Sequence, residues 1–418
     1  MACKGSGVQI PSAPLDKMKN FFIETKELLL SQGIIAVLAI IQVRVVATNL
    51  GPEIYGNIGV YLGFVGISFR ILNSRNSDLI LINSNLTDKN FTKSAVCLEL
   101  ILGVVSLFFV SSIFFIYYKS IENYLILYFF TRVLFNVQEV FKGVFTHTGD
   151  MKTYSLVESI SNITRFILVV SFISFSPSIS SFFFALSIHQ VVVSILVLIL
   201  LYKSNLNQSE TMNFKEYMRL SKKSFYKIRT DQAVGLIPTH LDVVVIGYFA
   251  NYYSAGIYRI AKKLVDPINS VIVAFSPWML NKISKNNNYN FKKLTINILI
   301  PSSILIIFIY YLFGNQLIQL IAGKAFYDSF SPMMILLVGF ISYYLTFWTR
   351  HYLLLNDLIL KHTIARVVNL VTFVLTAPLL ITNYGFNGIA FSISMSVLFQ
   401  KIYELSVYLK NKNLKNNI

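Results

Sequence analysis

Residues 179–202 read ISSFFFALSIHQVVVSILVLILLY and contain no Asp, Glu, Lys or Arg over their whole length. An α-helix needs about 20 apolar residues to cross the ~30 Å hydrocarbon core of a bilayer. The rest of the chain is similar, because 55% of its 418 residues are hydrophobic and only 13% are charged. Soluble domains carry about 25% charged residues. The sequence therefore predicts an all-α integral membrane protein.

About twelve hydrophobic segments of this kind can be read along the chain. They lie approximately at residues 28–48, 56–73, 95–118, 121–141, 155–176, 179–202, 232–250, 255–279, 294–314, 331–350, 362–382 and 386–409. The connections are mostly short, and the longest one lies at the middle of the chain. We therefore predict an N-terminal lobe of six spans (18–202), a basic linker (203–231), a C-terminal lobe of six spans (232–409) and a tail (410–418).

Residues 1–17 have no apolar periodicity and no signal-peptide core, so we expect no fold from them. Two interpretations stay open for this segment. It is either a short disordered tail or a mis-annotated stretch that precedes a native start at Met18.

The basic residues of the connections orient the chain in the membrane. All of them except Lys119 and Lys324 fall on the side of the N-terminus. Because Lys and Arg are retained on the cytoplasmic side, both termini are expected there, and the number of spans must be even. Topology and contact with anionic lipid then account for the net charge of +17. We expect no nucleic-acid partner.

The two halves of the chain match each other at an offset near 200 residues. Leu50–Gly56 (LGPEIYG) follows the first span, and Ala250–Gly256 (ANYYSAG) follows the seventh. Both are tight turns that end in Gly and lead into the next helix. Six spans per half give both halves the same orientation. This predicts a parallel repeat about an axis along the membrane normal, with a central cavity between two lobes.

Motifs for covalent or metal chemistry are missing from the sequence. It has no G-x-x-x-x-G-K-[ST] phosphate loop and no H-E-x-x-H pattern. Its two cysteines, Cys3 and Cys97, cannot complete a four-ligand zinc site. The outer loops are too short to hold the catalytic residues of a membrane glycosyltransferase. We therefore predict no cofactor, no metal, no catalytic residues and no enzymatic activity.

Three spans carry polar side chains at helical spacing. Ionisable groups inside a membrane are costly and usually face a bundle interior or a cavity, so each is a candidate functional residue. The stripes are Arg132, Asn136 and Glu139 in span 4, Glu158, Asn162 and Arg165 in span 5, and Arg259, Lys262, Lys263 and Asp266 in span 8.

Two interpretations of these stripes remain open. Arg132 with Glu139, or Glu158 with Arg165, could form buried pairs that hold the bundle together. Alternatively, the surplus of positive charge indicates a cationic cavity for a phosphate-bearing headgroup, since the Arg fork matches phosphate oxygens.

Asp242 lies near the middle of span 7, and His240 is on a different helical face. A carboxylate at this depth is either an ion-coupling site or a hydrogen-bonded side chain that faces a neighbouring helix. We take Asp242 and Glu139 as candidate ion-coupling residues and His189 as a core histidine. Basic residues closer to span ends are expected to snorkel to the interface. These are Arg44, Arg70, Lys142, Arg350, Arg366 and Lys401.

Two segments carry a family resemblance. Arg44–Gly56 (RVVATNLGPEIYG) and Asp242–Lys263 (DVVVIGYFANYYSAGIYRIAKK), set among twelve spans in two halves, resemble bacterial polysaccharide exporters. The chain is most similar to the O-antigen flippase (Wzx) type of the multidrug/oligosaccharidyl-lipid/polysaccharide exporter superfamily. The resemblance extends over nearly the whole chain from Met18.

The resemblance implies a V-shaped, two-lobed transporter in the bacterial inner membrane. Its substrate would be an undecaprenyl-pyrophosphate-linked oligosaccharide, moved to the outer leaflet by alternating access with ion coupling. A polymerase and a chain-length regulator of the same pathway would be partners. The second-half pattern places the cavity at Arg259, Lys262 and Lys263. A drug or cation antiporter of the same superfamily and an O-antigen polymerase or ligase remain alternatives.

If the arginines of spans 4 and 5 bind the headgroup, Arg132→Ala or Arg165→Ala abolishes export while the protein still inserts into the membrane. Surface polysaccharide and membrane-fraction protein are the two quantities to measure. Full export by both variants would remove these arginines from the mechanism.

Overall fold

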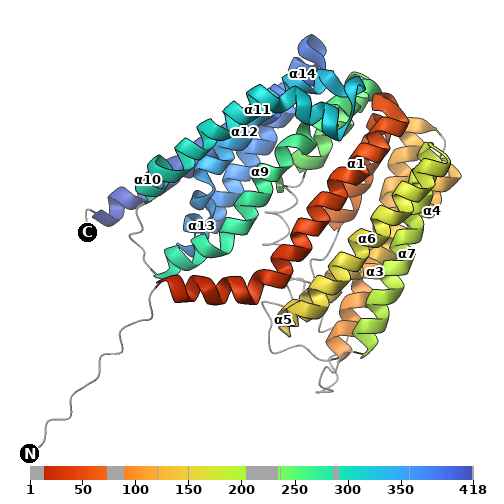
Figure 1. The fold of residues 1–418 in the computed structure, drawn as a ribbon, viewed down its shortest axis with the longest axis horizontal. Coiled ribbons are helices and arrows are strands. Elements are labelled where there is room, and N and C mark those ends of the chain that lie inside the picture. Colours follow the sequence, from red (N-terminus) through yellow and green to blue (C-terminus); the bar gives the residue numbers. More distant parts are fainter. Residues whose placement is uncertain are drawn as a thin grey trace, which may run out of the picture.

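The computed structural model describes residues 14–72, 89–119, 121–148, 150–203, 234–235, 237–285, 291–356 and 358–416 (Figure 1). These residues are almost entirely helical and contain no strand. Residues 1–13 of the predicted tail and residues 204–231 of the predicted linker lie outside the described residues.

The N-terminal lobe contains the first six spans. Its helices are α1 (Pro14–Leu72), α3 (Lys89–Tyr118), α4 (Asn123–Phe135), α5 (Gln138–His147), α6 (Met151–Phe175) and α7 (Ile179–Lys203). Helix α1 contains two spans, because Gly51 has a φ of 73° and precedes Pro52. Only glycine adopts this conformation without strain, so the chain turns sharply there. Helices α4 and α5 form the fourth span, with a break at Asn136 and Val137.

The C-terminal lobe begins with a short apolar helix, Ile237–Phe249. It continues with α9 (Tyr252–Lys285), α10 (Phe291–Leu294), η2 (Thr295–Leu299), α11 (Ile300–Ile321), η3 (Lys324–Ser329), α12 (Phe330–Thr346), α13 (Trp348–Leu355) and α14 (Ile359–Asn416). Gly385, with a φ of 54°, divides α14 into the last two spans. The π-helical turn η2 precedes Pro301, which has no N–H to donate to the preceding turn.

Each of the twelve predicted spans corresponds to helix among the described residues when each half of α1 and α14 is counted separately. Three of these helical segments are too short or too polar to be assigned as membrane spans from length and hydropathy alone. Helix 237–249 is short, α9 carries several charges, and the α4–α5 span is broken. The first and last helices are longer than the predicted spans 28–48 and 386–409. Helix α1 begins at Pro14, and α14 continues to Asn416.

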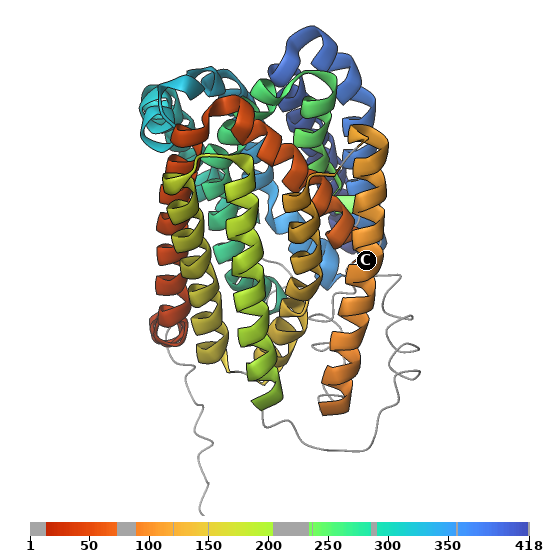
Figure 2. The same cartoon turned by 90° about the vertical axis from the view of Figure 1, so that its right-hand side faces the viewer.

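The two lobes meet at the end of the molecule where α1 turns, and they diverge toward the opposite end (Figure 1). Figure 2 shows the N-terminal lobe in front, where α7 lies between α6 and α4 and α3 lies next to α4, with the C-terminal helices behind them. Large apolar side chains such as Phe108, Ile304 and Leu375 are exposed on the outside of the bundle. An apolar outer surface of this kind suits contact with lipid.

The lobes contact each other where the second half of α1 crosses α9. A Cβ atom on Gly56 would overlap the Tyr252 carbonyl oxygen, and one on Gly256 would overlap the Pro52 carbonyl oxygen. The two glycines of the predicted repeat therefore face each other across the junction. Around them, one continuous core includes Tyr55 and Ile58 from α1. From the other lobe it includes Val243, Ile246, Ala255 and Ile257.

The backbone contact at Gly256 predicts that even a substitution by alanine destabilises the protein. Gly256→Ala should lower the free energy of unfolding by about 1–3 kcal/mol, because a methyl group cannot fit without shifting the backbone of the other lobe. Thermal unfolding of the purified protein in detergent measures this. Gly66→Ala is the control, since the three nearest atoms to its Cβ would be atoms of the His240 ring at 3.2–3.5 Å. Equal losses in both variants would contradict the close contact.

Candidate functional site

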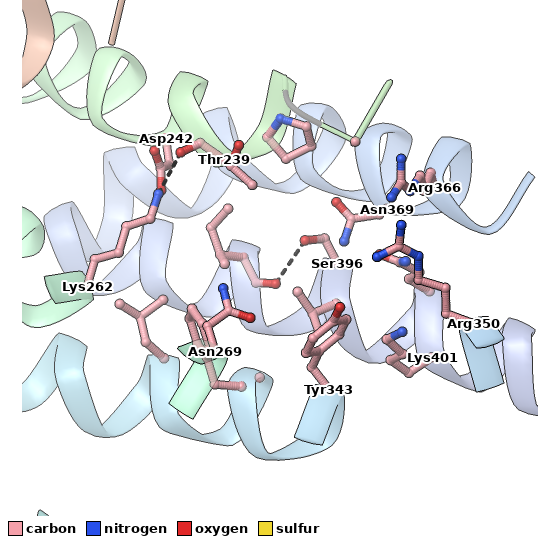
Figure 3. Close-up of a pocket in the computed structure, with 18 of the residues that line it drawn as sticks. Thr239, Asp242, Lys262, Asn269, Tyr343, Arg350, Arg366, Asn369, Ser396 and Lys401 are labelled. Atoms are coloured by element: carbon pink, nitrogen blue, oxygen red, sulfur yellow. Dashed lines mark hydrogen bonds and ion pairs between the residues drawn. The ribbon is translucent and has the colours of Figure 1, made fainter. Parts of the chain in front are cut away.

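A cavity of about 250 Å³ lies inside the C-terminal lobe (Figure 3). Helix 237–249, α9, α12, α13 and both halves of α14 contribute to its walls. Its lining includes four basic side chains and one carboxylate. These are Lys262, Arg350, Arg366 and Lys401, together with Asp242. Figure 3 places Asp242 and Lys262 at one end and Arg350 and Arg366 at the other.

Asp242 is fully buried, and its carboxylate oxygens are well satisfied. Lys262 Nζ lies 2.5 Å from Oδ2, and the Tyr258 hydroxyl donates to the same oxygen at 2.8 Å. The Val243 backbone N–H donates to Oδ1 at 2.8 Å. Lys262 also donates to the Thr239 carbonyl oxygen at 2.7 Å. Of the two interpretations of Asp242, the hydrogen-bonded side chain facing a neighbouring helix fits these contacts.

His240 points away from this pair. Its ring lies against Gly66 in the second half of α1, where an added Cβ would be 3.2 Å from Nδ1. The prediction that His240 and Asp242 occupy different faces of their helix is therefore confirmed.

Arg350 and Arg366 supply positive charge at the opposite end of the cavity. The Arg366 guanidinium packs against the backbone at Gly235, where a Cβ atom would be 2.9 Å from it. Arg350 Nε is buried and has no hydrogen-bond partner among the described residues. Asn369 and Ser396 also line the cavity and add polar groups. The guanidinium fork of Arg350, whose Nε is unpaired among the described residues, suits the oxygens of a phosphate or carboxylate.

Lys401 is 3% exposed, so the expectation that it snorkels to the interface is wrong. Its Nζ lies 2.8 Å from Glu404 Oε2 and 4.3 Å from the centroid of the Tyr343 ring. A carboxylate one turn further along the same helix therefore neutralises the ammonium within the lobe. Arg350 and Arg366 were also expected to snorkel, and the structure places them on the cavity wall.

The polar stripe of α9 divides among three environments. The Arg259 guanidinium lies 4.4 Å from the centroid of the Tyr55 ring and donates to the Tyr55 carbonyl oxygen at 3.0 Å. Lys262 lines the cavity. Lys263 forms an exposed pair with Asp266 at 2.8 Å. Of the three basic residues predicted for the cavity in this span, the cavity described above includes Lys262.

The predicted residues of spans 4 and 5 lie in the N-terminal lobe. The Arg132 guanidinium packs on the Phe135 ring at 4.8 Å, and Arg165 Nε is buried without a hydrogen-bond partner among the described residues. Helix α4, which carries Arg132, and helix α6, which carries Arg165, both pack against α7, which carries His189. His189 is a buried core histidine, as predicted, with Ser161 Oγ 3.2 Å from its Nε2.

Glu139 is on the same lobe as these two arginines. Its Oε1 lies 4.0 Å from Lys142 Nζ, at the start of α5. The two candidate ion-coupling carboxylates, Glu139 and Asp242, therefore belong to different lobes.

A profile described as "Polysaccharide biosynthesis protein" matches residues 23–280, which is more than half of the chain. The chain belongs to this family. A search of curated protein sequences gave no significant match.

Solved structures of two transporters and a flippase share the fold over more than nine tenths of the chain. An inward-facing multidrug resistance MATE family transporter of the MOP superfamily matches with a TM-score of 0.72 and 16% identity, covering 91% of this chain and 96% of its own. The lipid II flippase MurJ in an inward closed conformation matches with a TM-score of 0.67 and 17% identity, covering 91% and 86%.

The third is a MOP superfamily transporter from Pyrococcus furiosus, with a TM-score of 0.62, 15% identity and coverage of 94% and 95%. These likenesses confirm the predicted two-lobed membrane fold, and that fold is shared with transporters and flippases.

Sequence reasoning did not identify the cluster at Glu404. Neither this glutamate nor His362 was singled out from the sequence. The available signal was the i, i+3 spacing of Lys401 and Glu404 within an apolar span, where two charges on one face indicate a buried pair. His362 lies 3.4 Å from the same carboxylate from a distant part of α14, and no spacing rule predicts that contact.

The Asp242–Lys262 pair predicts a stability difference. Lys262→Met leaves Asp242 buried without its cation and should cost about 3–5 kcal/mol of unfolding free energy. Adding Asp242→Asn should restore much of the loss. Lys263→Met is the control, because its pair with Asp266 is exposed and contributes less than about 1 kcal/mol. Thermal unfolding in detergent compares the variants, and equal losses for Lys262→Met and Lys263→Met would contradict the assignment.

Proposed function

We propose that this protein is a flippase that moves an undecaprenyl-pyrophosphate-linked oligosaccharide from the cytoplasmic to the outer leaflet of the inner membrane. The observation that carries the proposal is the cavity with four basic side chains and one carboxylate, lined by helices of the C-terminal lobe. Membership of the polysaccharide biosynthesis family supports a glycan-bearing substrate.

The chemistry of such a substrate fits the cavity. A pyrophosphate and its sugars cannot enter hydrocarbon unshielded, while the lipid tail can stay in the bilayer. Arg350 and Arg366 present forked donors suited to phosphate oxygens, and Lys262 and Lys401 add point charges. Asn369 and Ser396 are suited to hydrogen bonds with the first sugar.

Alternating access by the two lobes would carry the headgroup across. If the N-terminus is cytoplasmic, as the basic loops indicate, the Gly56–Gly256 junction lies at the outer end. The lobes then separate toward the cytoplasm, which corresponds to a state ready for loading. The basic segment 203–231 would link lobes 18–202 and 232–409 on that side.

The N-terminal lobe is proposed to supply a second contact for the headgroup. Arg132 and Arg165 would engage it when the lobes approach each other, with Arg259 and Lys263 near its path. Asp242 and Glu139 remain candidates for ion coupling. For Asp242, that role requires the ion to displace Lys262 from the carboxylate.

A surface-polysaccharide gel of a clean deletion in the native host tests the proposal. Loss of a flippase removes every repeat from the lipid core and leaves lipid-linked repeats in the inner leaflet. Loss of a polymerase leaves a core capped with one repeat, because export still works. That result, or an unchanged polysaccharide with loss of drug resistance, would contradict the flippase assignment.

Complementation of the deletion tests the cavity itself. Arg350→Ala and Arg366→Ala should each reduce export at least tenfold, since a lost charge-assisted phosphate contact is worth about 1.5–3 kcal/mol. Lys361→Ala is the matched control, because Lys361 is an exposed cation on the same helix as Arg366. Immunoblots of the membrane fraction establish equal amounts of protein. Wild-type export by both arginine variants would contradict the cavity assignment.

A further inference from the structure

A buried group of charges lies beside the proposed headgroup cavity. Glu404 is fully buried, and His362 and Lys401 are 2% and 3% exposed. His362 and Lys401 line the cavity. The group joins the two halves of α14, and Thr349 from α13 completes it.

The Glu404 carboxylate has hydrogen-bond donors on both oxygens. Oε2 accepts from Lys401 Nζ at 2.8 Å and from the Thr349 hydroxyl at 2.6 Å. Oε1 accepts from Gln400 Nε2 at 3.0 Å. His362 Nδ1 lies 3.4 Å from the same Oε1.

His362 differs from the other members of the group. Neither of its ring nitrogens has a hydrogen-bond partner among the described residues, although the ring is almost completely buried. Buried polar atoms are nearly always paired, so an imidazole beside a carboxylate with neither nitrogen bonded needs an explanation. A proton on Nδ1 would turn the 3.4 Å approach into a charged hydrogen bond to Oε1.

Lys401 is the member of the group that can reach a ligand. Its ammonium touches Glu404, rests on the Tyr343 ring and lines the cavity. A lysine on its flexible stem can move its charge over a short distance. If Lys401 turned to a phosphate oxygen, Glu404 would be left as an uncompensated buried charge, which is strongly unfavourable.

We propose that binding of a diphosphate in this cavity is coupled to the uptake of one proton by His362. Lys401 Nζ moves from Glu404 to a phosphate oxygen, and a proton from water adds to His362 Nδ1. The imidazolium then donates to Glu404 Oε1, so the carboxylate keeps one cationic partner before and after binding. This inference rests on the proposed function, because it takes the diphosphate as the ligand.

The charges around His362 favour this sequence of events. A bound diphosphate adds negative charge to the cavity that His362 lines, and negative charge nearby favours the protonated form of an imidazole. The titratable or charged groups that line the cavity together with His362 are Lys401 on the second half of α14, Arg366 on the first half, Arg350 on α13, Tyr343 on α12, and Asp242, Tyr258 and Lys262 across the cavity. Glu404 lies beside the ring, and His351 is on α13.

Calorimetry on the purified full chain in detergent tests the coupling. The probe is geranyl diphosphate-linked N-acetylglucosamine, whose doubly esterified phosphates do not titrate near neutral pH. Titrations in two buffers of different ionisation enthalpy give the number of protons exchanged. We expect uptake of about one proton, and an affinity that weakens up to about tenfold per unit of rising pH once the histidine is neutral in the free protein.

Two variants identify the proton acceptor. His362→Gln keeps a donor for Glu404 but cannot titrate, so it should bind the probe with no proton uptake. Lys401→Met should also bind without uptake, more weakly, because Glu404 then requires a protonated His362 before the ligand arrives. His189→Gln, a buried histidine of the other lobe, is the control and should retain the uptake of the unmodified protein.

The outcomes separate this inference from the function on which it rests. Binding without proton uptake in the unmodified protein, or unchanged uptake in His362→Gln, overturns the inference and leaves the flippase proposal intact. Absence of binding by the unmodified protein overturns both the anion site and the inference. If His362→Gln does not fold, Lys401→Met decides the question, and full uptake in that variant overturns the proposal.

Discussion

A charge buried among membrane-spanning helices has no water to solvate it, so it must find a partner inside the protein. This constraint organises the C-terminal lobe. Asp242 joins helix 237–249 to α9 through Lys262 and Tyr258. Glu404 joins the second half of α14 to α13 through Thr349. Each carboxylate thus connects helices that apolar packing alone would hold with little preference for one register.

The cavity lies between these two paired sites. Lys262 and Lys401 each line it and are each held by a carboxylate. Arg350 and Arg366 line it as well, and Arg350 Nε has no hydrogen-bond partner among the described residues. The lobe therefore keeps its lysines neutralised in place while it presents arginine donors to the cavity. An anion can therefore bind the arginine donors first, before either lysine leaves its carboxylate.

The fold was predictable because it depends on local properties of the sequence. Apolar runs of membrane length determine the spans. The turns at Gly51 and Gly385 require a positive φ that glycine readily adopts. The repeat was visible because Gly56 and Gly256 both permit backbone contact at the junction. What could not be read was how far each helix extends, since Pro14 and Asn416 lie outside the apolar runs.

The site was predicted less well, because it depends on contacts between distant segments. Spacing identified Lys262 and Asp242 separately and gave them different roles, yet they form one ion pair. Spacing also grouped Arg259 with Lys262, although the two side chains face different lobes. Distance from a span end indicated snorkelling for Lys401, and only the tertiary structure shows that Glu404 holds it inside. Periodicity predicts the helical face on which a residue lies, but not which helix packs against that face.

The position of Arg259 and Lys262 on one helix connects the junction to the cavity. Arg259 contacts the Tyr55 ring and carbonyl oxygen of the N-terminal lobe, and one turn later Lys262 contacts Asp242. Separation of the lobes at this junction must either break the Arg259 contacts or move α9 with the N-terminal lobe. In the second case Lys262 is drawn away from Asp242. An anion that binds Lys262 also breaks its ion pair with Asp242, and this pair is one of the contacts that hold α9 to helix 237–249. Occupancy of the cavity and closure of the junction therefore act on the same helix, through Lys262 and Arg259, which are one turn apart.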